Sequence, residues 1–372
     1  MATLVTEPTI MLAAGGTGGH LFPAFALAEE LGRRGFTVDL ITDMRGDRYG
    51  TGFPARAVHQ IPSATLKSRA PLAVAATAVA LGRGLVGAYR LLGQVRPVVV
   101  AGFGGYPTFP PLVAARARGI ATLIHEQNAV LGRANRMLAA RATAIATSFE
   151  QTKLLEGAAG TKARFTGNPV RSSVIEASRR PYAPPSATSP IVLLVFGGSQ
   201  GARYFSDTVP PALAALPAAV RARLAVIQQC RDEDLPRVEE AYRTAGINAN
   251  LAAFFRNLPE LMATAHFVIG RAGASTVAEL TVLGRPSLLV PLPHALDNDQ
   301  LNNAKRLAES GAAWCIEQQE LSVERLSGQL GGLFARPDAL AAAAASARRL
   351  GRPDAVARLA DVIVGLANTA RR

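Results

Sequence analysis

Short apolar runs of strand length alternate with helix-like stretches along almost the whole chain. In the first half, runs at 10–14, 36–41 and 97–101 predict strands, and in the second half so do runs at 191–196, 267–269 and 287–291. Runs that are apolar throughout, without an alternating polar face, are typical of strands buried on both sides of a sheet. The alternation therefore predicts an α/β fold with parallel sheets and crossover helices.

The same order of strand, glycine loop and helix opens the chain and returns after residue 190. A composition break, rich in Pro and Ser, lies at 181–190 between the two copies. We predict two doubly wound Rossmann-like domains that face a cleft, spanning residues 1–170 and 171–351. The Ala-rich tail is interrupted at Gly351, and we expect its last helix, about 352–372, to pack back on the first domain.

Four of the predicted strands end in glycine-rich loops, at residues 15–20, 102–106, 197–201 and 270–276. Glycine lets the backbone approach a ligand closely, and a following helix start favours an anion, so phosphate is the first ligand to consider. The first loop lacks the Lys of a P-loop and has Leu21 where a dinucleotide fingerprint needs its third Gly. An NAD-dependent oxidoreductase, with Asp43 on the ribose, stays an alternative at this point.

Polar side chains also follow two of the apolar runs. The run 122–124 leads into His125, Glu126, Gln127 and Asn128, and ligands of open α/β sheets sit at such carboxyl ends. His20 follows the first loop, where an imidazole is suited to act as a base near neutral pH. In the fourth loop, the spacing Thr276-x-x-Glu279 is read either as a capping box or as a pair of ligand contacts.

The net charge of +13 is unevenly distributed over the 372 residues. Residues 1–170 carry 18 basic and 9 acidic side chains, and residues 171–372 carry 22 and 18. A basic first half attracts an anionic membrane, a nucleic acid or an acidic substrate, although a merely solubilising surface fits as well. Residues 70–92 are apolar apart from Arg83 and Arg90, which fits a helix at a membrane interface or a buried packing helix. Two distant cysteines indicate neither disulfides nor a zinc site, as expected of a cytoplasmic protein.

Six segments in series give a specific resemblance: GGTGGH at 15–20, GFGGY at 102–106, HEQN at 125–128, GNPVR at 167–171, GGSQGA at 197–202 and GASTVAE at 273–279. Together they resemble the MurG family, the lipid-linked N-acetylglucosaminyltransferases of bacterial peptidoglycan synthesis. The resemblance implies a GT-B fold and no cofactor. It also implies an inverting transfer of GlcNAc from UDP-GlcNAc to the muramoyl-pentapeptide of undecaprenyl-diphosphate lipid I, which gives lipid II. A related GT-B enzyme with another acceptor is the nearest alternative.

The resemblance also implies the site residues. For the base we expect His20, with Glu126 as the alternative. The expected UDP-GlcNAc contacts are Thr17, Gly18, Gly19, Asn128, Arg171, Ser199, Phe255, Ala274, Ser275, Thr276, Glu279 and Gln300. The expected acceptor contacts are Thr17, His20, Gly104, Gly105 and Tyr106.

One stretch departs from the family pattern, because Asp299 precedes Gln300 where His-Gln or Gln-Gln is common. It creates a D-x-D sequence at 297–299 of the kind that binds a divalent ion, yet the helix start already supplies positive charge, and we expect no metal. As partners we expect UDP-GlcNAc, lipid I and an anionic membrane surface, and no nucleic acid. The expected location is peripheral, on the cytoplasmic face of the inner membrane, with attachment weakened by salt.

Overall fold

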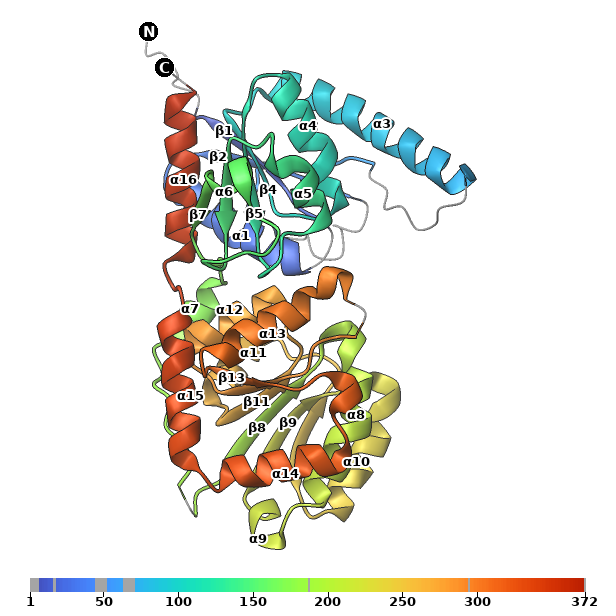
Figure 1. Cartoon of the computed structure of the whole chain (residues 1–372), viewed down its shortest axis with the longest axis vertical. Helices are drawn as coiled ribbons and strands as arrows, with labels where there is room; N and C mark the ends of the chain where they lie inside the picture. Colours follow the sequence, from blue (N-terminus) through green and yellow to red (C-terminus); the bar gives the residue numbers. More distant parts are fainter. Residues whose placement is uncertain are drawn as a thin grey trace. The chain divides into compact units, whose positions relative to one another are not determined.

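The computed structural model describes residues 7–15, 18–43, 52–62, 71–186, 188–293 and 295–370, with the backbone alone at 71–76, 199–202 and 296. The chain divides into two compact units (Figure 1). Unit 1 comprises Met1–Arg171 and Arg352–Arg372, and unit 2 comprises Ser172–Gly351.

Unit 1 is built on a parallel sheet of seven strands among its described residues, in the order β3-β2-β1-β4-β5-β6-β7. The strands are β1 (Thr9–Ala13), β2 (Thr37–Thr42), β3 (Ala57–Gln60), β4 (Val99–Gly102), β5 (Ala121–Glu126), β6 (Ala144–Thr147) and β7 (Ala163–Phe165). The helices are α1 (Gly18–Arg33), α3 (Pro71–Val95), η1 (Tyr106–Thr108), α4 (Phe109–Ala117), α5 (Arg133–Ala139), α6 (Gly157–Gly160) and α16 (Ala355–Thr369).

Side chains of β1 alternate between two separate cores of unit 1, as the pleat of a strand requires. Ile10 and Leu12 face a core shared with α1 and α16, and Met11 faces a core shared with α3, α4 and α5. Figure 1 accordingly shows α16 on the side of the sheet opposite to α3 and α4. Leu359 and Ile363 of α16 are fully buried in the first core, so the end of the chain is an integral part of unit 1.

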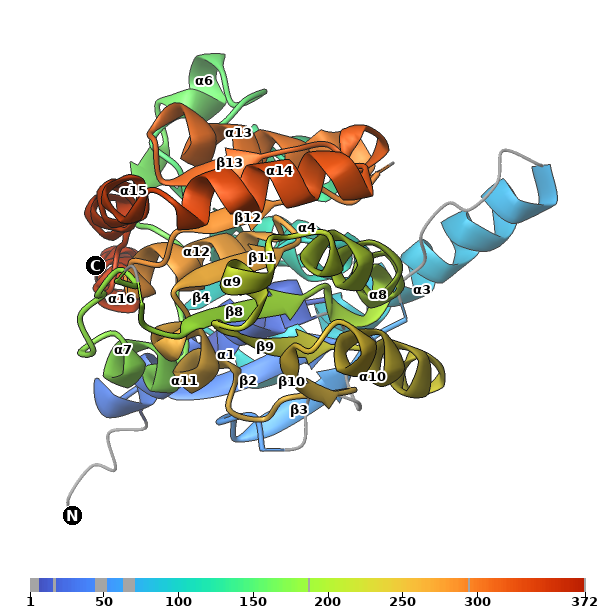
Figure 2. The same cartoon turned by 90° about the horizontal axis from the view of Figure 1, so that it is seen from below.

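Unit 2 repeats the design with a parallel sheet of six strands among its described residues, ordered β10-β9-β8-β11-β12-β13. The strands are β8 (Ile191–Phe196), β9 (Leu224–Gln229), β10 (Asn248–Ala252), β11 (Phe267–Gly270), β12 (Ser287–Leu289) and β13 (Ala313–Cys315). The helices are α7 (Ser172–Ala177), α8 (Gly198–Ala214), α9 (Ala218–Arg221), η2 (Asp232–Asp234), α10 (Leu235–Thr244), α11 (Leu258–Thr264), α12 (Ala274–Leu283), η3 (Leu296–Asn298), α13 (Asp299–Glu309), η4 (Gln318–Glu320), α14 (Val323–Phe334) and α15 (Pro337–Leu350). Helices α8, α10 and α14 share one core with the sheet, whereas α7 packs on α11 and α12 (Figure 2).

The prediction of two doubly wound α/β domains is confirmed by the two parallel sheets. In unit 1 the strand order reverses between β1 and β4, and in unit 2 it reverses between β8 and β11. All four predicted glycine loops follow these four strands. Each unit therefore has a pair of glycine loops at its switch point, the place where the strand order reverses. Ligands of open α/β sheets bind at such a point.

The first helix begins earlier than its sequence suggests. Pro favours the first turn of a helix, so a start at Pro23 is the natural prediction, but α1 begins at Gly18 and carries Pro23 inside it. Pro23 has no amide hydrogen, so the carbonyl four residues earlier loses its helical partner, which a helix tolerates near its end. As a consequence, His20 lies within the first turn of α1 and not in a loop before it.

Candidate functional site

The loops at the switch point of unit 1 close around His20. A Cβ atom on Gly104 would lie 3.2 Å from the imidazole Cε1 of His20, and one on Gly105 would lie 3.5 Å from its Nε2. A Cβ atom on Gly15 would lie 3.5 Å from Cδ2 of the same ring. Gly104 and Gly105 have φ values of +88° and +76°, which L side chains rarely adopt. The glycines therefore allow the backbone to enclose the imidazole while it stays half-buried, and Tyr106 follows them in η1.

Behind this loop, His125 and Gln127 form a buried hydrogen-bonded pair. Nε2 of His125 lies 3.1 Å from the carbonyl of Gly167, and its Nδ1 lies 3.0 Å from Nε2 of Gln127. Since the carbonyl can only accept, the partners assign the proton to Nε2 and leave Nδ1 as the acceptor. Gln127 also donates to the carbonyl of Phe103 at 2.9 Å. Burial lowers the pKa of His125 to about 4, so this ring is a neutral structural group at physiological pH.

Glu126 organises the segment that follows β5. Its Oε1 accepts hydrogen bonds from the amide of Asn128 at 3.0 Å and from Nδ2 of the same residue at 3.3 Å. Its Oε2 accepts from the amide of Gly132 at 2.9 Å and from Nδ2 of Asn135 at 2.8 Å. Burial raises the pKa of Glu126, and these donors oppose the shift. Each carboxylate oxygen of Glu126 is thus already engaged by two hydrogen-bond donors.

Sequence reasoning missed Asn135, which lies in α5. Its Nδ2 also contacts the carbonyl of His125 at 3.3 Å, so one amide ties α5 to both His125 and Glu126. The available signal was a polar residue on the apolar face of a short helix, flanked by Ala134 and Leu138, which are both buried. Such a residue usually has a specific buried partner.

The start of α12 forms the corresponding site in unit 2, and here the capping-box prediction is wrong. The helix begins at Ala274, its N-cap is Gly273 in an extended conformation, and no side chain caps it. Thr276 is thus the third helical residue and cannot be the N-cap. The first-turn amides of a helix have no carbonyl partner within it and carry its partial positive charge. Leaving them without a side-chain cap fits a site where a ligand supplies the acceptor.

Three side chains of α12 add hydrogen-bonding groups to this site. The hydroxyl of Ser275 is buried and has no hydrogen-bond partner among the described residues. Thr276 is half-buried beside it, and Glu279 lies buried one turn further along α12. A buried hydroxyl without a partner has an unmet hydrogen-bonding capacity that a ligand oxygen can satisfy.

Side-chain amides fasten the other loops of unit 2 to this site. Oε1 of Gln229 accepts from the amide of Gly198 at 3.0 Å, and Nε2 of Gln229 donates to the carbonyl of Ala253 at 3.1 Å. This places the segment that carries the half-buried Phe255 beside the β8 loop. Nδ2 of Asn303, on α13, donates to the carbonyl of Ala272 at 3.0 Å and so holds the α12 loop. Gln229 and Asn303 are further positioning groups that the motifs did not single out.

The D-x-D sequence lies at the start of α13. Asp297 and Asn298 adopt left-handed backbone conformations, and Oδ1 of Asp299 accepts the amide of Gln300 at 2.7 Å. Burial raises the pKa of Asp299. Oε1 of Gln300 accepts from the amide of Leu292 at 3.0 Å. Within the described ranges, no group of three or more His, Cys, Asp or Glu residues is placed to hold a metal ion.

The remaining predicted residues are distributed over both units. Arg171, at the end of unit 1, lies over the ring of Phe22 at 4.9 Å from its centroid. Gly18 and Gly19 begin α1, and half-buried Asn128 follows the β5 cluster. Thr17 lies outside the described residues, and of Ser199 only the backbone, in the first turn of α8, is described. The structure thus brings His20 together with Gly104 and Gly105 in unit 1, and Ser275 together with Thr276 and Glu279 in unit 2.

Helix α3 packs against the core of unit 1 with some of its side chains and exposes other apolar side chains. Val79, Val86 and Tyr89 are 62%, 50% and 43% exposed, although Ala88 and Leu92 are buried against the unit 1 core. Arg118 covers the ring of Tyr89 at 3.8 Å. Across the described residues, no helix is long and apolar enough to cross a membrane.

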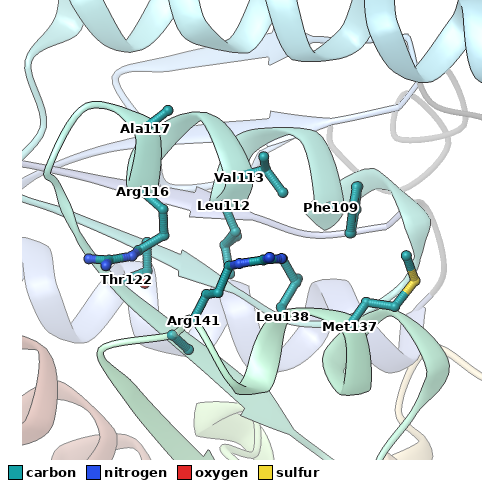
Figure 3. A pocket seen from close by; sticks show the side chains of 10 residues that line it. Phe109, Leu112, Val113, Arg116, Ala117, Thr122, Met137, Leu138 and Arg141 are labelled. Carbon is teal, nitrogen blue, oxygen red and sulfur yellow. The ribbon is translucent and has the colours of Figure 1, made fainter.

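A cavity of about 400 Å³ lies between α4 and α5 (Figure 3). Its apolar lining includes Phe109, Leu112 and Met137, the last of which is 58% exposed. Arg116 and Arg141 also line this cavity. Apolar surface next to arginines is the combination that an anionic bilayer surface matches.

Comparisons with known proteins fit these two units. The glycosyltransferase family 28 N-terminal domain matches residues 10–147, and the family 28 C-terminal domain matches residues 192–359. The UDP-N-acetylglucosamine--N-acetylmuramyl-(pentapeptide) pyrophosphoryl-undecaprenol N-acetylglucosamine transferase of Methylobacterium sp. (strain 4-46) is 53% identical over 97% of each chain. The protein of the same name from Chelativorans sp. (strain BNC1) is 52% identical over 97% of this chain and 96% of its own.

A solved structure gives the same result for the fold. The crystal structure of MurG from Acinetobacter baumannii matches with a TM-score of 0.79 and 30% identity, over 96% of this chain and 99% of that one. The GT-B fold expected from the resemblance is thereby confirmed.

Proposed function

The chain belongs to the MurG family of glycosyltransferases, and from this premise we propose that it transfers GlcNAc from UDP-GlcNAc to the muramoyl-pentapeptide of undecaprenyl-diphosphate lipid I. The product is lipid II, the lipid-linked disaccharide of peptidoglycan synthesis. The identity of more than half of the positions over nearly the whole of both chains carries this proposal, because it extends over both units. The glycine loops at both switch points are the proposed binding sites of the two substrates.

In this proposal the diphosphate of UDP-GlcNAc binds at the start of α12. The uncapped first turn, with the amides of Ala274, Ser275 and Thr276, offers donors and partial positive charge to the departing UDP. The partnerless hydroxyl of Ser275 adds a further donor. Glu279 binds the ribose, the backbone near Phe255 the uracil, and Gln300 the sugar. The remaining donor contacts are assigned by family resemblance to Thr17, Gly18, Gly19, Asn128, Arg171 and Ser199.

The acceptor binds at the loops of unit 1, with Thr17, His20, Gly104, Gly105 and Tyr106 as its contacts. His20 takes the proton of the acceptor hydroxyl as its oxygen forms a bond to C1 of GlcNAc. The bond from C1 to the UDP oxygen breaks at the same time, its electron pair leaves with UDP, and the configuration at C1 inverts. Neither the proton transfer nor the displacement needs a covalent enzyme intermediate or a cofactor.

A transfer assay with radiolabelled UDP-GlcNAc and a lipid I analogue tests the function. We expect label to appear in the lipid product with the purified full chain. Calorimetric titration with UDP, with NADH as the control ligand, tests the donor separately, and UDP alone is expected to bind. UDP binding without transfer to lipid I would instead favour a GT-B enzyme with another acceptor.

We further propose that unit 1 attaches the enzyme peripherally to the cytoplasmic face of the inner membrane. The exposed apolar side chains of α3 and the arginine-flanked cavity of Figure 3 support this, as does the basic balance of residues 1–170. The double variant V79E/V86E is expected to lose binding to anionic vesicles, and wild-type binding is expected to weaken with salt. The variant V58E/L154E adds the same two charges at exposed unit 1 positions outside α3 and serves as the matched control. Equal loss in both variants would contradict a role for α3.

A further inference from the structure

A second cavity lies in unit 2, where the segment after α7 meets the C-terminal end of α12 and one face of α15. Its volume of about 410 Å³ is within the range of small-molecule sites. Arg179, Arg180 and Arg348 line it, and Tyr182 and Leu283 contribute apolar surface. None of the residues lining this cavity belongs to either glycine-loop site.

The charge of this cavity is uncompensated by carboxylates. No acidic residue lines it, and within the described part of the chain none of its three arginines forms an ion pair. A fourth arginine, Arg285, is fully buried next to it, with its guanidinium 5.4 Å from the ring centroid of Tyr182. Burial lowers the pKa of Arg285 to about 10, and the like charges of Arg180 and Arg348 contribute to the shift. The cluster therefore repels itself when no anion is present.

Two of the four arginines donate hydrogen bonds to carbonyl groups at helix ends. Arg285 donates to the carbonyl of Ala263 at 2.6 Å, near the end of α11, and Arg348 donates to the carbonyl of Val282, near the end of α12. Cations at helix C-termini are stabilising, so these two guanidinium groups have a structural role. This role does not extend to Arg179 and Arg180, whose side chains are exposed at the rim and make no hydrogen bond that the described residues reveal.

We propose that this cavity is a second anion site, which binds a small molecule that bears a phosphate or diphosphate group. Arg179 and Arg180 hold the phosphate oxygens, since guanidinium groups match phosphate through paired charge-assisted hydrogen bonds. Tyr182 and Leu283 receive the uncharged part of the molecule. The bound anion relieves the repulsion among the arginines, and this gain favours a ligand with at least two negative charges. A soluble phosphorylated compound and a lipid phosphate headgroup share this chemistry.

Calorimetric titration of the full chain with inorganic pyrophosphate tests the site. UDP is kept at saturation, so that the proposed donor site is occupied. We expect one pyrophosphate per chain, with binding weakened about ten-fold or more in the double variant R179A/R180A. The backbone carbonyl that Arg285 contacts at residue 180 is retained in this variant, and unchanged Tm and UDP affinity will show that it is folded.

The matched control is R243A/R336A, which removes the same two charges from unit 2 outside the cavity, at an ion pair with Glu240 and at a bond to the carbonyl of Gly332. Pyrophosphate affinity within about two-fold of wild type is expected there, because distant exposed charges are largely screened. Equal weakening in both double variants, or no effect of R179A/R180A, would overturn the proposal.

Vesicles identify the source of the phosphate. Binding to phosphatidylcholine vesicles is compared with and without phosphatidate for the same two double variants. If the wild type and the control bind vesicles only when phosphatidate is present, and R179A/R180A loses this binding, the ligand is a lipid headgroup. If the wild type binds pyrophosphate but shows no such vesicle binding, the ligand is a soluble compound. A wild-type chain that binds neither pyrophosphate nor phosphatidate contradicts the site altogether. Neither double variant changes a residue of the proposed donor or acceptor site, so these outcomes do not depend on the proposed transfer reaction.

Discussion

The two switch points have the same topology and different chemistry. In unit 1 the loops after β1 and β4 enclose an imidazole, and a buried network of His125, Glu126 and Gln127 supports them. In unit 2 the loops after β8 and β11 lead into helices, and the start of α12 presents backbone amides with Ser275. In the proposed function, the first site serves proton transfer and the second holds the negative charge of the departing UDP.

This difference shows how one architecture serves two substrates. A parallel sheet with crossover helices fixes where loops converge, and the side chains placed there decide what the loops do. In unit 1 the polar groups of this network bond to one another and support the loop that encloses the half-buried imidazole of His20. In unit 2 no side chain of the described residues caps the first turn of α12, and we propose that a ligand accepts hydrogen bonds from its amides. The following substitutions test this division.

Replacement of His20 by Ala removes the proposed base and is expected to have the largest effect. We expect kcat for GlcNAc transfer to fall about 100-fold or more, with the KM for UDP-GlcNAc within a few-fold of wild type. His59→Ala, at an edge strand next to Asp39, is the control and should retain activity. A change in the donor KM alone would assign His20 to binding instead of proton transfer.

The buried His125 makes the stability of unit 1 depend on pH. Its pKa of about 4 lies below the unfolded value near 6.5, so the unfolded chain binds more protons between these values. Stability is therefore complete above about pH 6.5 and is lost as the pH falls towards 4, by up to about 3 kcal/mol. Urea unfolding at several pH values measures this loss.

The variant H125Q isolates that effect, since Gln can donate to the carbonyl of Gly167 without titrating. Its stability should change less with pH over the same range than that of the wild type. Glu126 acts in the opposite direction, because burial raises its pKa and the folded chain retains its proton longer as the pH rises. Parallel pH profiles for the two proteins would show that His125 is not responsible.

Gly104→Ala tests how tightly the loop encloses His20. The added Cβ meets the imidazole at 3.2 Å and φ is +88°, so the chain must relax at a cost of about 1–2 kcal/mol. Activity should fall with stability. Gly119→Ala has a similar φ of +73° with no atom within 4 Å of its Cβ, so it should lose similar stability and keep its activity. Equal activity in both variants would mean that the loop does not position the imidazole.

Ser275→Ala is expected to have the smallest effect. A lost hydrogen bond of about 1 kcal/mol predicts an increase of about five-fold in the KM for UDP-GlcNAc, with stability unchanged or slightly higher. Ser287→Ala removes another buried hydroxyl without a partner in the described structure, within β12, and should leave the KM unchanged. If both variants bind UDP-GlcNAc like the wild type, the hydroxyl of Ser275 does not contact the donor.

The strands were the most predictable part of the fold. Run 191–196 coincides with β8, because a strand buried on both faces is apolar throughout and its limits appear in the sequence. Helix starts were less predictable. Pro23 mimics a helix start from inside α1, and Thr276 with Glu279 satisfies the capping-box spacing although Gly273 is the N-cap. Local patterns cannot decide between such alternatives when tertiary packing sets the helix start.

The motifs placed the glycine loops and the polar cluster at the switch points, but they did not distinguish a base from a supporting group. Glu126 and His125 differ from His20 in burial and in their hydrogen-bond partners, which come from distant parts of the chain. Asn303 bonds a carbonyl 31 positions earlier, and His125 one that lies 42 positions later. Such contacts follow from the packing of whole elements and leave no local signal in the sequence.

The return of α16 to unit 1 has a consequence for synthesis on the ribosome. Unit 2 is continuous in sequence, so it can fold as soon as it has emerged from the exit tunnel. Unit 1 is made first, but one of its cores lacks the side chains of α16 until residues 355–369 are translated. Leu31 and its neighbours in this core therefore stay without these packing partners while all of unit 2 is synthesised. The first unit to be translated is thus the last whose core can be completed.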